Sequence, residues 1–151
     1  MRRKRQDPSK NLVGFTVGDV TYAVPIDAVR EIVNPLPVVD LPRSPPSVRG
    51  VADYRNEVVP VVDLRARFGL ASAPATRRTK WLVVRAAGHL VALVVDAVTE
   101  VFRGEEALRP TPPTGTREGR YIFGVTTRRG KLVFVLDLER LARDDGEEAT
   151  T

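Results

Sequence analysis

The order of apolar and polar residues along the chain predicts short strands joined by tight turns, with little helix. The clearest case is a pair of runs rich in β-branched residues, 48–54 and 58–62, on either side of a polar turn, which is typical of a β-hairpin. Asn56 stands where that turn needs a positive φ, which Asn tolerates better than most residues other than glycine. Asp63 can then cap a short helical turn that ends at Gly69. The segment therefore predicts a strand–turn–strand–helix unit.

This unit occurs twice in the chain. The pairs that match at a shift of 74 positions include Gly50 and Gly124, Asn56 and Gly130, and Asp63 and Asp137. The match of Asn with Gly is informative, because glycine is the residue that adopts positive φ most readily. A second block, residues 23–32, repeats as residues 92–101 at a shift of 69 positions. Two blocks in the same order predict a tandem duplication of one small β subdomain, with a polar linker at about residues 71–79.

Each copy is completed by further predicted strands and short helical turns. Strands are expected at residues 12–17, 20–24, 38–41, 81–85 and 90–95. Helical turns are expected at residues 26–32, 96–101 and 138–143. In the first of these, Ile26, Val29 and Ile32 recur at a spacing that places them on one helical face. Many short strands with few helical residues predict an all-β fold of two small barrels, with a groove between them for a partner.

Length and composition support a folded protein with a substantial core. The chain has 151 residues, of which 42% are apolar, enough for one ordinary domain or two small ones. The folded part is expected at residues 12–143. Residues 1–11 form a basic arm and residues 144–151 an acidic tail, and we expect both to be disordered. No apolar run approaches the ~20 residues of a transmembrane helix and no secretory signal is present, which predicts a cytoplasmic protein without membrane insertion.

The net charge of +5 raises one alternative function, a basic β-barrel module that binds nucleic acid. Four of the positive charges lie at residues 2–5, and many others lie in predicted turns. Binding of single strands by such a module uses exposed aromatic side chains for base stacking. Aromatic residues make up only 6% of the chain and occupy mostly strand positions suited to the core. We therefore expect no nucleic-acid partner.

The chain offers no combination of residues that predicts catalysis. It has no cysteine, and it lacks the signatures of serine nucleophiles, phosphate-binding glycine loops and metal-ligand clusters. The only histidine, His89, lies in a predicted turn. Asp63 and Asp137 follow equivalent strands, where Asp is common as a helix cap. The sequence thus predicts no catalytic residue, no metal site and no cofactor, and it favours a binding module over an enzyme.

Several residues are candidates for a partner contact, each with a plainer interpretation beside it. Glu31 ends the first predicted helical turn and is equally well explained as a solvated charge. Arg55 lies at or just before a hairpin tip, where it is either a solvated turn residue or an interface anchor, a common role for exposed arginine. Val29 and Val101 fit the core better than an interface on pattern alone.

At these positions the sequence resembles the CheW-type chemotaxis coupling proteins, over residues 12–143. The matching motifs are F-x-x-G-D-x-x-Y-A-V (15–24), V-x-E-I (29–32), L-P (41–42), V-R-G-V (48–51), V-V-P-V-V-D-L-R-x-R-F-G (58–69) and V-V-D-x-V (94–98). The long motif, V-x-E-I and V-V-D-x-V in this order and spacing are quite specific. The resemblance implies an all-β fold of two intertwined five-stranded, SH3-like barrels with short helices, which agrees with the duplication.

The resemblance also implies a function without catalysis. Such proteins bridge the cytoplasmic tips of chemoreceptors, the methyl-accepting proteins, to the regulatory domain of a CheA-type histidine kinase, at membrane-associated or cytoplasmic receptor clusters. The family's receptor-binding positions fall here on Val29, Glu31, Gly50, Arg55 and Val101. Val29 and Val101 would form an apolar groove between the barrels, with Glu31 and Arg55 at its rim and Gly50 keeping the backbone close-packed. Kinase contacts would lie on the barrel ends.

One motif departs from the family pattern. The usual N-L-R-G turn is Asp53-Tyr54-Arg55-Asn56 in this chain, so Arg55 is kept while Asn56 replaces glycine. We expect the turn to form, because Asn tolerates positive φ, and the fold to be unaffected. The departure bears instead on the choice of receptor or kinase. No receiver or kinase segment accompanies the motifs, which predicts a stand-alone coupling protein.

Overall fold

The computed structural model describes residues 11–105 and 108–144. The predicted basic arm and acidic tail therefore lie outside the described residues, except at their inner ends. Asn11 is the first residue of a strand, and Asp144 caps the last helix and accepts a hydrogen bond from the Tyr121 hydroxyl. Asn11 and Asp144 thus both take part in the fold.

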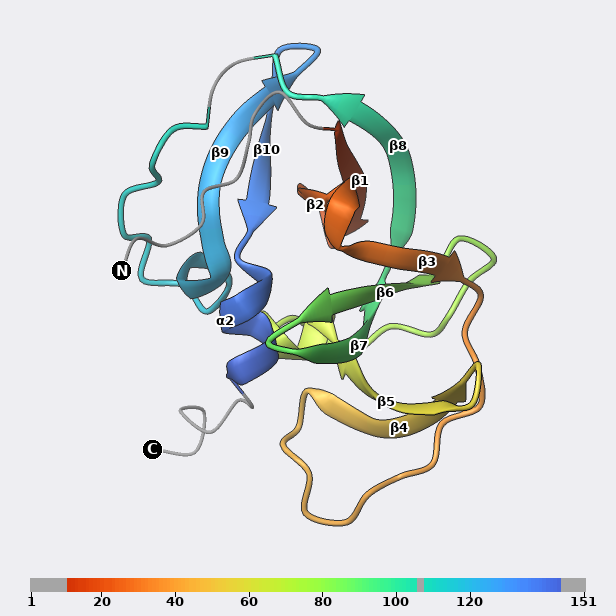
Figure 1. The fold of residues 1–151 in the computed structure, drawn as a ribbon. Helices are drawn as coiled ribbons and strands as arrows, with labels where there is room; N and C mark the ends of the chain where they lie inside the picture. The colour runs from red at the N-terminus through yellow and green to blue at the C-terminus, as the bar shows by residue number, and fades with distance from the viewer. Residues whose placement is uncertain (1–10, 106–107, 145–151) are drawn as a thin grey trace.

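The described residues form ten strands and four short helices (Figure 1). The strands are β1 (Asn11–Val17), β2 (Val20–Pro25), β3 (Val29–Val33), β4 (Val48–Tyr54), β5 (Glu57–Asp63), β6 (Lys80–Ala86), β7 (His89–Val95), β8 (Ala97–Arg103), β9 (Ile122–Arg128) and β10 (Lys131–Leu136). The helices are η1 (Ile26–Ala28), α1 (Leu64–Arg67), η2 (Glu118–Tyr121) and α2 (Leu138–Arg143), where η marks a 3-10 helix. The predicted all-β fold with short helices is confirmed.

The strands form two five-stranded sheets with the same internal order. One sheet runs β8-β1-β2-β10-β9 and the other β3-β6-β7-β5-β4, and they occupy the upper and lower parts of Figure 1. Each sheet combines three strands from one copy of the duplication with two from the other. A parallel pair joins the copies in each sheet, β2 with β10 and β5 with β7. The two barrels are therefore intertwined, as the family resemblance implied.

Two of the predicted helical turns are wrong, because most of their residues lie in strands. Residues 26–32 form the 3-10 helix η1 followed by β3, and residues 97–101 belong to β8. Both strands contain a β-bulge, where the register shifts between Val29 and Glu31 in β3 and opposite Gly14 in β8. A bulge inserts one residue, so the alternation of two becomes a local spacing of three that resembles helical periodicity.

The predicted strand at residues 38–41 is reduced to a single bridge. Val39, which lies outside the named strands, pairs with Val51 of β4 through two backbone hydrogen bonds of 2.8 and 2.9 Å. Pro37 and Pro42 flank this point, and proline has no N–H with which to continue a ladder. The other sheet has the equivalent bridge, Arg109 with Val125. The duplication therefore extends into the loops.

The turns and caps follow the sequence prediction closely. Asn56 has φ 68° and Gly130 has φ 76°, so both duplicated turns use the positive φ expected of them. Asp63 accepts a hydrogen bond from the Arg65 N–H, and Asp137 accepts one from the Arg140 N–H. The predicted capping role of both aspartates is confirmed, as is the closing helix α2.

The largest core cluster contains residues from both sheets. It includes Phe15 and Tyr22 from one sheet with Leu82 and Leu93 from the other. A second cluster around Trp81 belongs to the sheet of β3–β7, and a third around Phe102 to the other sheet. Because one core spans both sheets, we expect the two barrels to unfold together rather than one at a time.

Candidate functional site

Two of the sequence-predicted site residues form an ion pair at a barrel seam. Glu31 lies on β3 and Arg55 in the turn after β4, and these strands are the two edges of their sheet. The Arg55 guanidinium donates to both carboxylate oxygens, from Nε to Oε1 at 2.8 Å and from Nη2 to Oε2 at 2.9 Å. The Tyr54 hydroxyl also donates to Glu31 Oε1, at 2.6 Å. The pair therefore joins the open edges of this barrel with the fork geometry that suits arginine and carboxylate.

The pair is electrostatically well matched and still reachable from solvent. Hydrogen bonds from Arg55 and then Tyr54 lower the pKa of Glu31 to about 2. Burial, with the hydrogen bond to Glu31, raises the pKa of Tyr54, and the bond to Glu31 raises the pKa of Arg55. The Arg55 side chain is 68% exposed and that of Glu31 is 33% exposed. Glu31 thus orients an arginine that a partner can contact.

The lowered pKa of Glu31 predicts a pH dependence of folding. In the folded state the pKa of Glu31 is lowered from the ordinary value of 4.5 to about 2. The ionised carboxylate therefore stabilises the fold fully above about pH 4.5. This contribution to the free energy of unfolding is lost as the pH falls toward about 2. We expect Glu31→Gln to lower the free energy of unfolding at neutral pH and to matter progressively less in acid. Urea unfolding of both proteins from about pH 6 to about pH 2 measures this difference. A difference that is constant across the range would contradict the prediction.

Gly50 occupies a place where the backbone of two segments meets. Its φ is +145°, and a Cβ atom built there would lie 2.1 Å from the carbonyl oxygen of Val39. Glycine is therefore required both by the backbone conformation and by the space available. This is the close approach that the sequence led us to expect. Gly50 itself is buried, so it supports the neighbouring surface without presenting a side chain.

The two valines among the predicted residues lie on different sheets. Val29 begins β3 and packs, half-buried, against the shared core. Val101 lies on β8 and is 49% exposed, so the pattern-based expectation that it belongs to the core is wrong. The structure therefore brings Glu31 and Arg55 into contact and places Val29 and Gly50 in the same sheet. Val101 lies on β8, the edge strand of the other sheet.

The second barrel has a matching ion pair that sequence reasoning missed. Glu100 on β8 accepts hydrogen bonds of 2.9 and 3.0 Å from Arg128 on β9, and these strands are the edges of that sheet. The shift of 69 positions that relates the duplicated blocks places Glu31 on Glu100. The shift of 74, however, places Arg55 on Arg129, while the bidentate partner is the residue before it. The repeat thus pointed to the carboxylate and to Arg129, whose Nη2 lies 3.9 Å from Glu100 Oε1, but not to the bidentate partner Arg128.

The described residues meet neither the requirements of a metal site nor those of a membrane-spanning helix. Among them, no group of three or more His, Cys, Asp or Glu side chains could hold a metal ion. His89 is exposed, with Nδ1 3.1 Å from the carbonyl oxygen of Ala87. No helix in this part of the chain has the length and hydropathy to cross a membrane.

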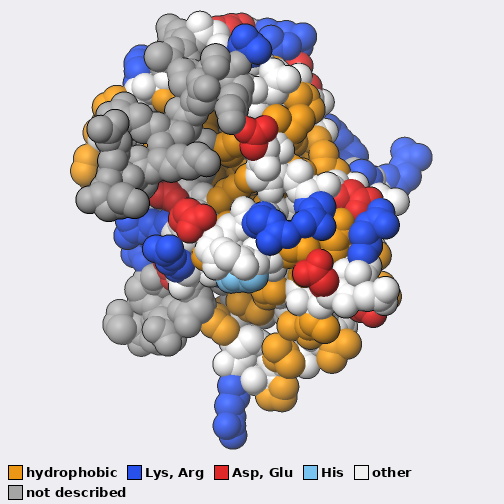
Figure 2. Space-filling model, in the orientation of Figure 1, with side chains coloured by type: hydrophobic (Ala, Val, Ile, Leu, Met, Phe, Trp, Pro, Cys, Tyr) orange, Lys and Arg blue, Asp and Glu red, His pale blue; other side chains and the backbone are white. Residues whose placement is uncertain are grey.

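The visible face in Figure 2 mixes basic and acidic side chains over its middle. Apolar side chains gather at its lower end, where the loop between β3 and β4 lies. That loop contains Val39 and Leu41, two of the large apolar residues that the fold leaves exposed. Most of the aromatic side chains, by contrast, are buried. They are Phe15, Tyr22, Tyr54, Phe68, Trp81, Phe102 and Tyr121.

A family model described as the CheW-like domain matches residues 11–146. The chain belongs to the CheW-like domain family. It is 32% identical over 145 residues to the chemotaxis protein CheW of Helicobacter pylori, covering 94% of this chain and 88% of that protein. It is 30% identical over 124 residues to protein FrzA of Myxococcus xanthus, covering 82% and 78%.

A solved structure agrees with this membership. The scaffolding protein TtCheW of Thermoanaerobacter tengcongensis superimposes with a TM-score of 0.83 and 27% identity, covering 91% of this chain and 95% of that one. The CheW-like fold, with its two intertwined barrels, and the membership predicted from the sequence are confirmed. The predicted role as a scaffold of chemotaxis-type signalling is confirmed with them.

Proposed function

We propose that this protein couples the cytoplasmic tips of chemoreceptors to the regulatory domain of a CheA-type histidine kinase, as a non-enzymatic cytoplasmic scaffold. The observation that carries the proposal is the CheW-like match, which spans both barrels. A scaffold of this kind needs surfaces for two partners and no reactive group. The absence of a metal-binding cluster from the described residues is consistent with that role.

The receptor surface in this proposal consists of the five predicted residues with distinct tasks. Arg55 provides the exposed charge, and Glu31 holds its guanidinium in one orientation through two hydrogen bonds. Val101 provides exposed apolar area on β8. Gly50 and Val29 support this surface from inside the fold, because Gly50 is buried and Val29 is half-buried. An exposed arginine is a common anchor of protein interfaces.

The alternative of a nucleic-acid-binding barrel has less support. Stacking of unpaired bases requires aromatic faces in contact with solvent. The aromatic side chains most central to the barrels, such as Tyr22, Tyr54 and Trp81, are buried. Binding through charge alone would depend steeply on salt concentration. Salt-sensitive binding of DNA or RNA that persists after removal of residues 1–5 would favour this alternative.

The decisive experiment compares binding of a receptor-tip fragment and of a kinase regulatory domain by calorimetry. We expect Arg55→Ala to weaken receptor binding by about tenfold, the usual effect of removing an interface anchor, and to leave kinase binding unchanged. Arg129→Ala is the matched control, because Arg129 occupies the equivalent hairpin turn, also has positive φ and is 73% exposed. It should alter neither affinity by more than about twofold, as is usual for a surface substitution.

Three outcomes would contradict the proposal. Failure of the unaltered protein to bind either partner at tens of micromolar would count against the coupling function as a whole. Equal weakening of both affinities by an Arg55→Ala protein that still folds would contradict the assignment of Arg55 to the receptor surface alone. Equal effects of Arg55→Ala and Arg129→Ala on receptor binding would place the receptor surface elsewhere.

A further inference from the structure

Asp96 lies where the chain crosses from one barrel to the other. It falls between β7, in the sheet of β3–β7, and β8, at the edge of the other sheet. Its backbone N–H donates to the carbonyl oxygen of Thr16 at 2.9 Å. Its carboxylate oxygen Oδ2 accepts a hydrogen bond of 2.8 Å from the N–H of Gly18, in the turn between β1 and β2. The crossover is thus attached to the first hairpin by both backbone and side chain.

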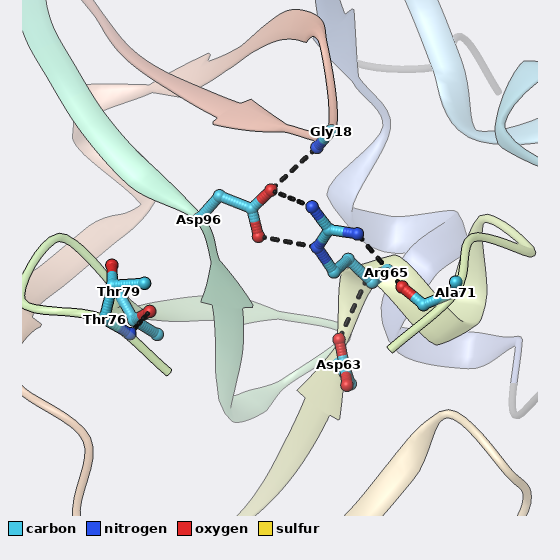
Figure 3. Close-up of polar contacts among 7 residues, drawn as sticks. All are labelled: Gly18, Asp63, Arg65, Ala71, Thr76, Thr79 and Asp96. Atoms are coloured by element: carbon cyan, nitrogen blue, oxygen red, sulfur yellow. Dashed lines mark hydrogen bonds and ion pairs between the residues drawn. The ribbon is translucent and has the colours of Figure 1, made fainter. Parts of the chain in front are cut away.

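The same carboxylate also accepts hydrogen bonds from Arg65 (Figure 3). Arg65 donates from Nε to Oδ1 at 3.0 Å and from Nη2 to Oδ2 at 2.9 Å. Its remaining nitrogen, Nη1, donates to the carbonyl oxygen of Ala71, and its backbone N–H to Asp63. The hydrogen bond to Asp96 raises the pKa of Arg65, which stays charged. This cluster, called the crossover clamp below, therefore joins helix α1 to the start of β8.

The strand that follows the clamp, β8, pairs with β1 in a register that changes by one residue at a bulge. Thr99 is the extra residue of the β8 bulge, so that Phe15 pairs with Val98 but Gly14 pairs with Glu100. A Cβ atom on Gly14 would lie 2.7 Å from Thr99 Oγ1. Closing the bulge would shift the rest of β8 by one residue, and a shift of one residue turns each side chain to the opposite face. Val101, which now pairs with Val13, would then turn from its exposed position.

The two halves of the duplicated fold differ at this turn. In the other half the equivalent turn is closed more simply, because the N–H of Ala87 donates directly to Glu139 Oε2 at 3.1 Å. Glu139 stands at the position equivalent to Arg65, at the shift of 74 residues. The position of Arg65 therefore carries a carboxylate in its counterpart, and the fork-shaped contact from Arg65 is made at the crossover that leads to Val101.

We propose that Asp96 is a positioning residue for the receptor surface. Held by Arg65 and Gly18, it keeps β8 in the bulged register and so keeps the Val101 side chain exposed to solvent. This inference rests on the proposed function, but its structural part can be tested without any partner.

The test uses Asp96→Asn, with Asp19→Asn as the matched control. Asp19 is an exposed carboxylate in the same β1–β2 turn whose charge also favours charged Arg65. We expect Asp96→Asn to weaken receptor-tip binding by about tenfold, as the loss of a charge-assisted hydrogen bond would, and to change kinase binding by less than about twofold. Asp19→Asn should leave both affinities unchanged.

Two further measurements separate positioning from a general loss of stability. In nuclear magnetic resonance spectra, the cross-strand contacts between Val13 and Val101 should weaken in Asp96→Asn while those between β6 and β7 persist. Arg65→Lys should reproduce both effects, because lysine keeps the charge but cannot donate from a planar fork. The double variant Asp96→Asn/Arg65→Lys should lose no more receptor affinity than either single variant, because the two side chains form one contact.

Clear results would overturn the inference. An unchanged Val13–Val101 contact in Asp96→Asn would remove its structural basis, whatever happens to binding. An altered register with unchanged receptor affinity would show that β8 does not contribute to the receptor surface. If the unaltered protein binds no receptor tip, the proposed function fails, and the register measurement still decides whether the clamp specifies β8.

Discussion

Gly50→Ala is expected to lower the free energy of unfolding by roughly 3 kcal/mol or more, because strain and overpacking act together at this position. The added Cβ would lie 2.1 Å from the carbonyl oxygen of Val39, a backbone atom that cannot rotate away. Relief would require breaking the two hydrogen bonds between Val39 and Val51. Urea unfolding followed by circular dichroism measures the loss.

Two other glycines serve as controls that separate the causes. Gly88 has φ +84°, but a Cβ atom added there would meet nothing within 4 Å, so Gly88→Ala reports the backbone strain alone. Gly124, the counterpart of Gly50, would place a Cβ 3.0 Å from the carbonyl oxygen of Arg109, so Gly124→Ala reports a milder contact. We expect losses of roughly 1 kcal/mol for Gly88→Ala, from strain at positive φ. A loss at Gly50 no larger than these controls would contradict the prediction.

The second large effect is expected at Arg67, a buried arginine of α1 whose side chain reaches α2. Its side chain is 5% exposed, and it donates from Nε to Ser47 Oγ at 2.8 Å and from Nη1 to the Leu141 carbonyl oxygen at 2.9 Å. Its guanidinium also lies 5.7 Å from the centre of the Tyr121 ring. Arg67→Ala removes all three contacts and leaves a cavity, for an expected loss of about 3 kcal/mol in unfolding free energy.

The duplication suggests how to dissect this loss. Leu141 is the residue equivalent to Arg67, so Arg67→Leu places the same apolar side chain on both sides of the helix contact. It should be less damaging than Arg67→Ala, because leucine fills part of the cavity that alanine leaves, while both variants leave the Leu141 carbonyl oxygen without its donor. Arg140→Ala, an exposed arginine on α2, is the control and should change stability by less than about 0.5 kcal/mol. An Arg67→Ala protein as stable as this control would contradict the prediction.

The candidate site shows how far repeat and motif can guide interpretation. Glu31 and Arg55 are 24 residues apart, and nothing in either strand alone indicates that they meet. Their contact depends on β3 and β4 being opposite edges of one sheet, which is a property of the closed barrel. The same closure pairs Glu100 with Arg128, so the duplication predicts that a second seam contact exists. It does not predict the arginine that makes it.

The crossover clamp was beyond sequence reasoning for a related reason. Asp96 and Arg65 each lie in a recognisable motif, but the local pattern places each of them in a short helical turn and indicates no contact between them. Their contact arises because the chain passes from one barrel into the other between β7 and β8. Side chains at such a crossover meet partners from both halves, and local periodicity carries no information about them.

The hairpins, the caps and the duplication can be predicted from the sequence, because they depend on residues close together in the chain. Asn56 and Gly130 specify their turns through the φ values that they tolerate, and Asp63 and Asp137 cap helices that start one residue later. The tertiary arrangement, by contrast, sets which strands pair, since each barrel takes strands from both copies. It also decided that the segments around Val29 and Thr99 are bulged strands, because an edge strand gains hydrogen bonds from its neighbour that an isolated helical turn would forgo.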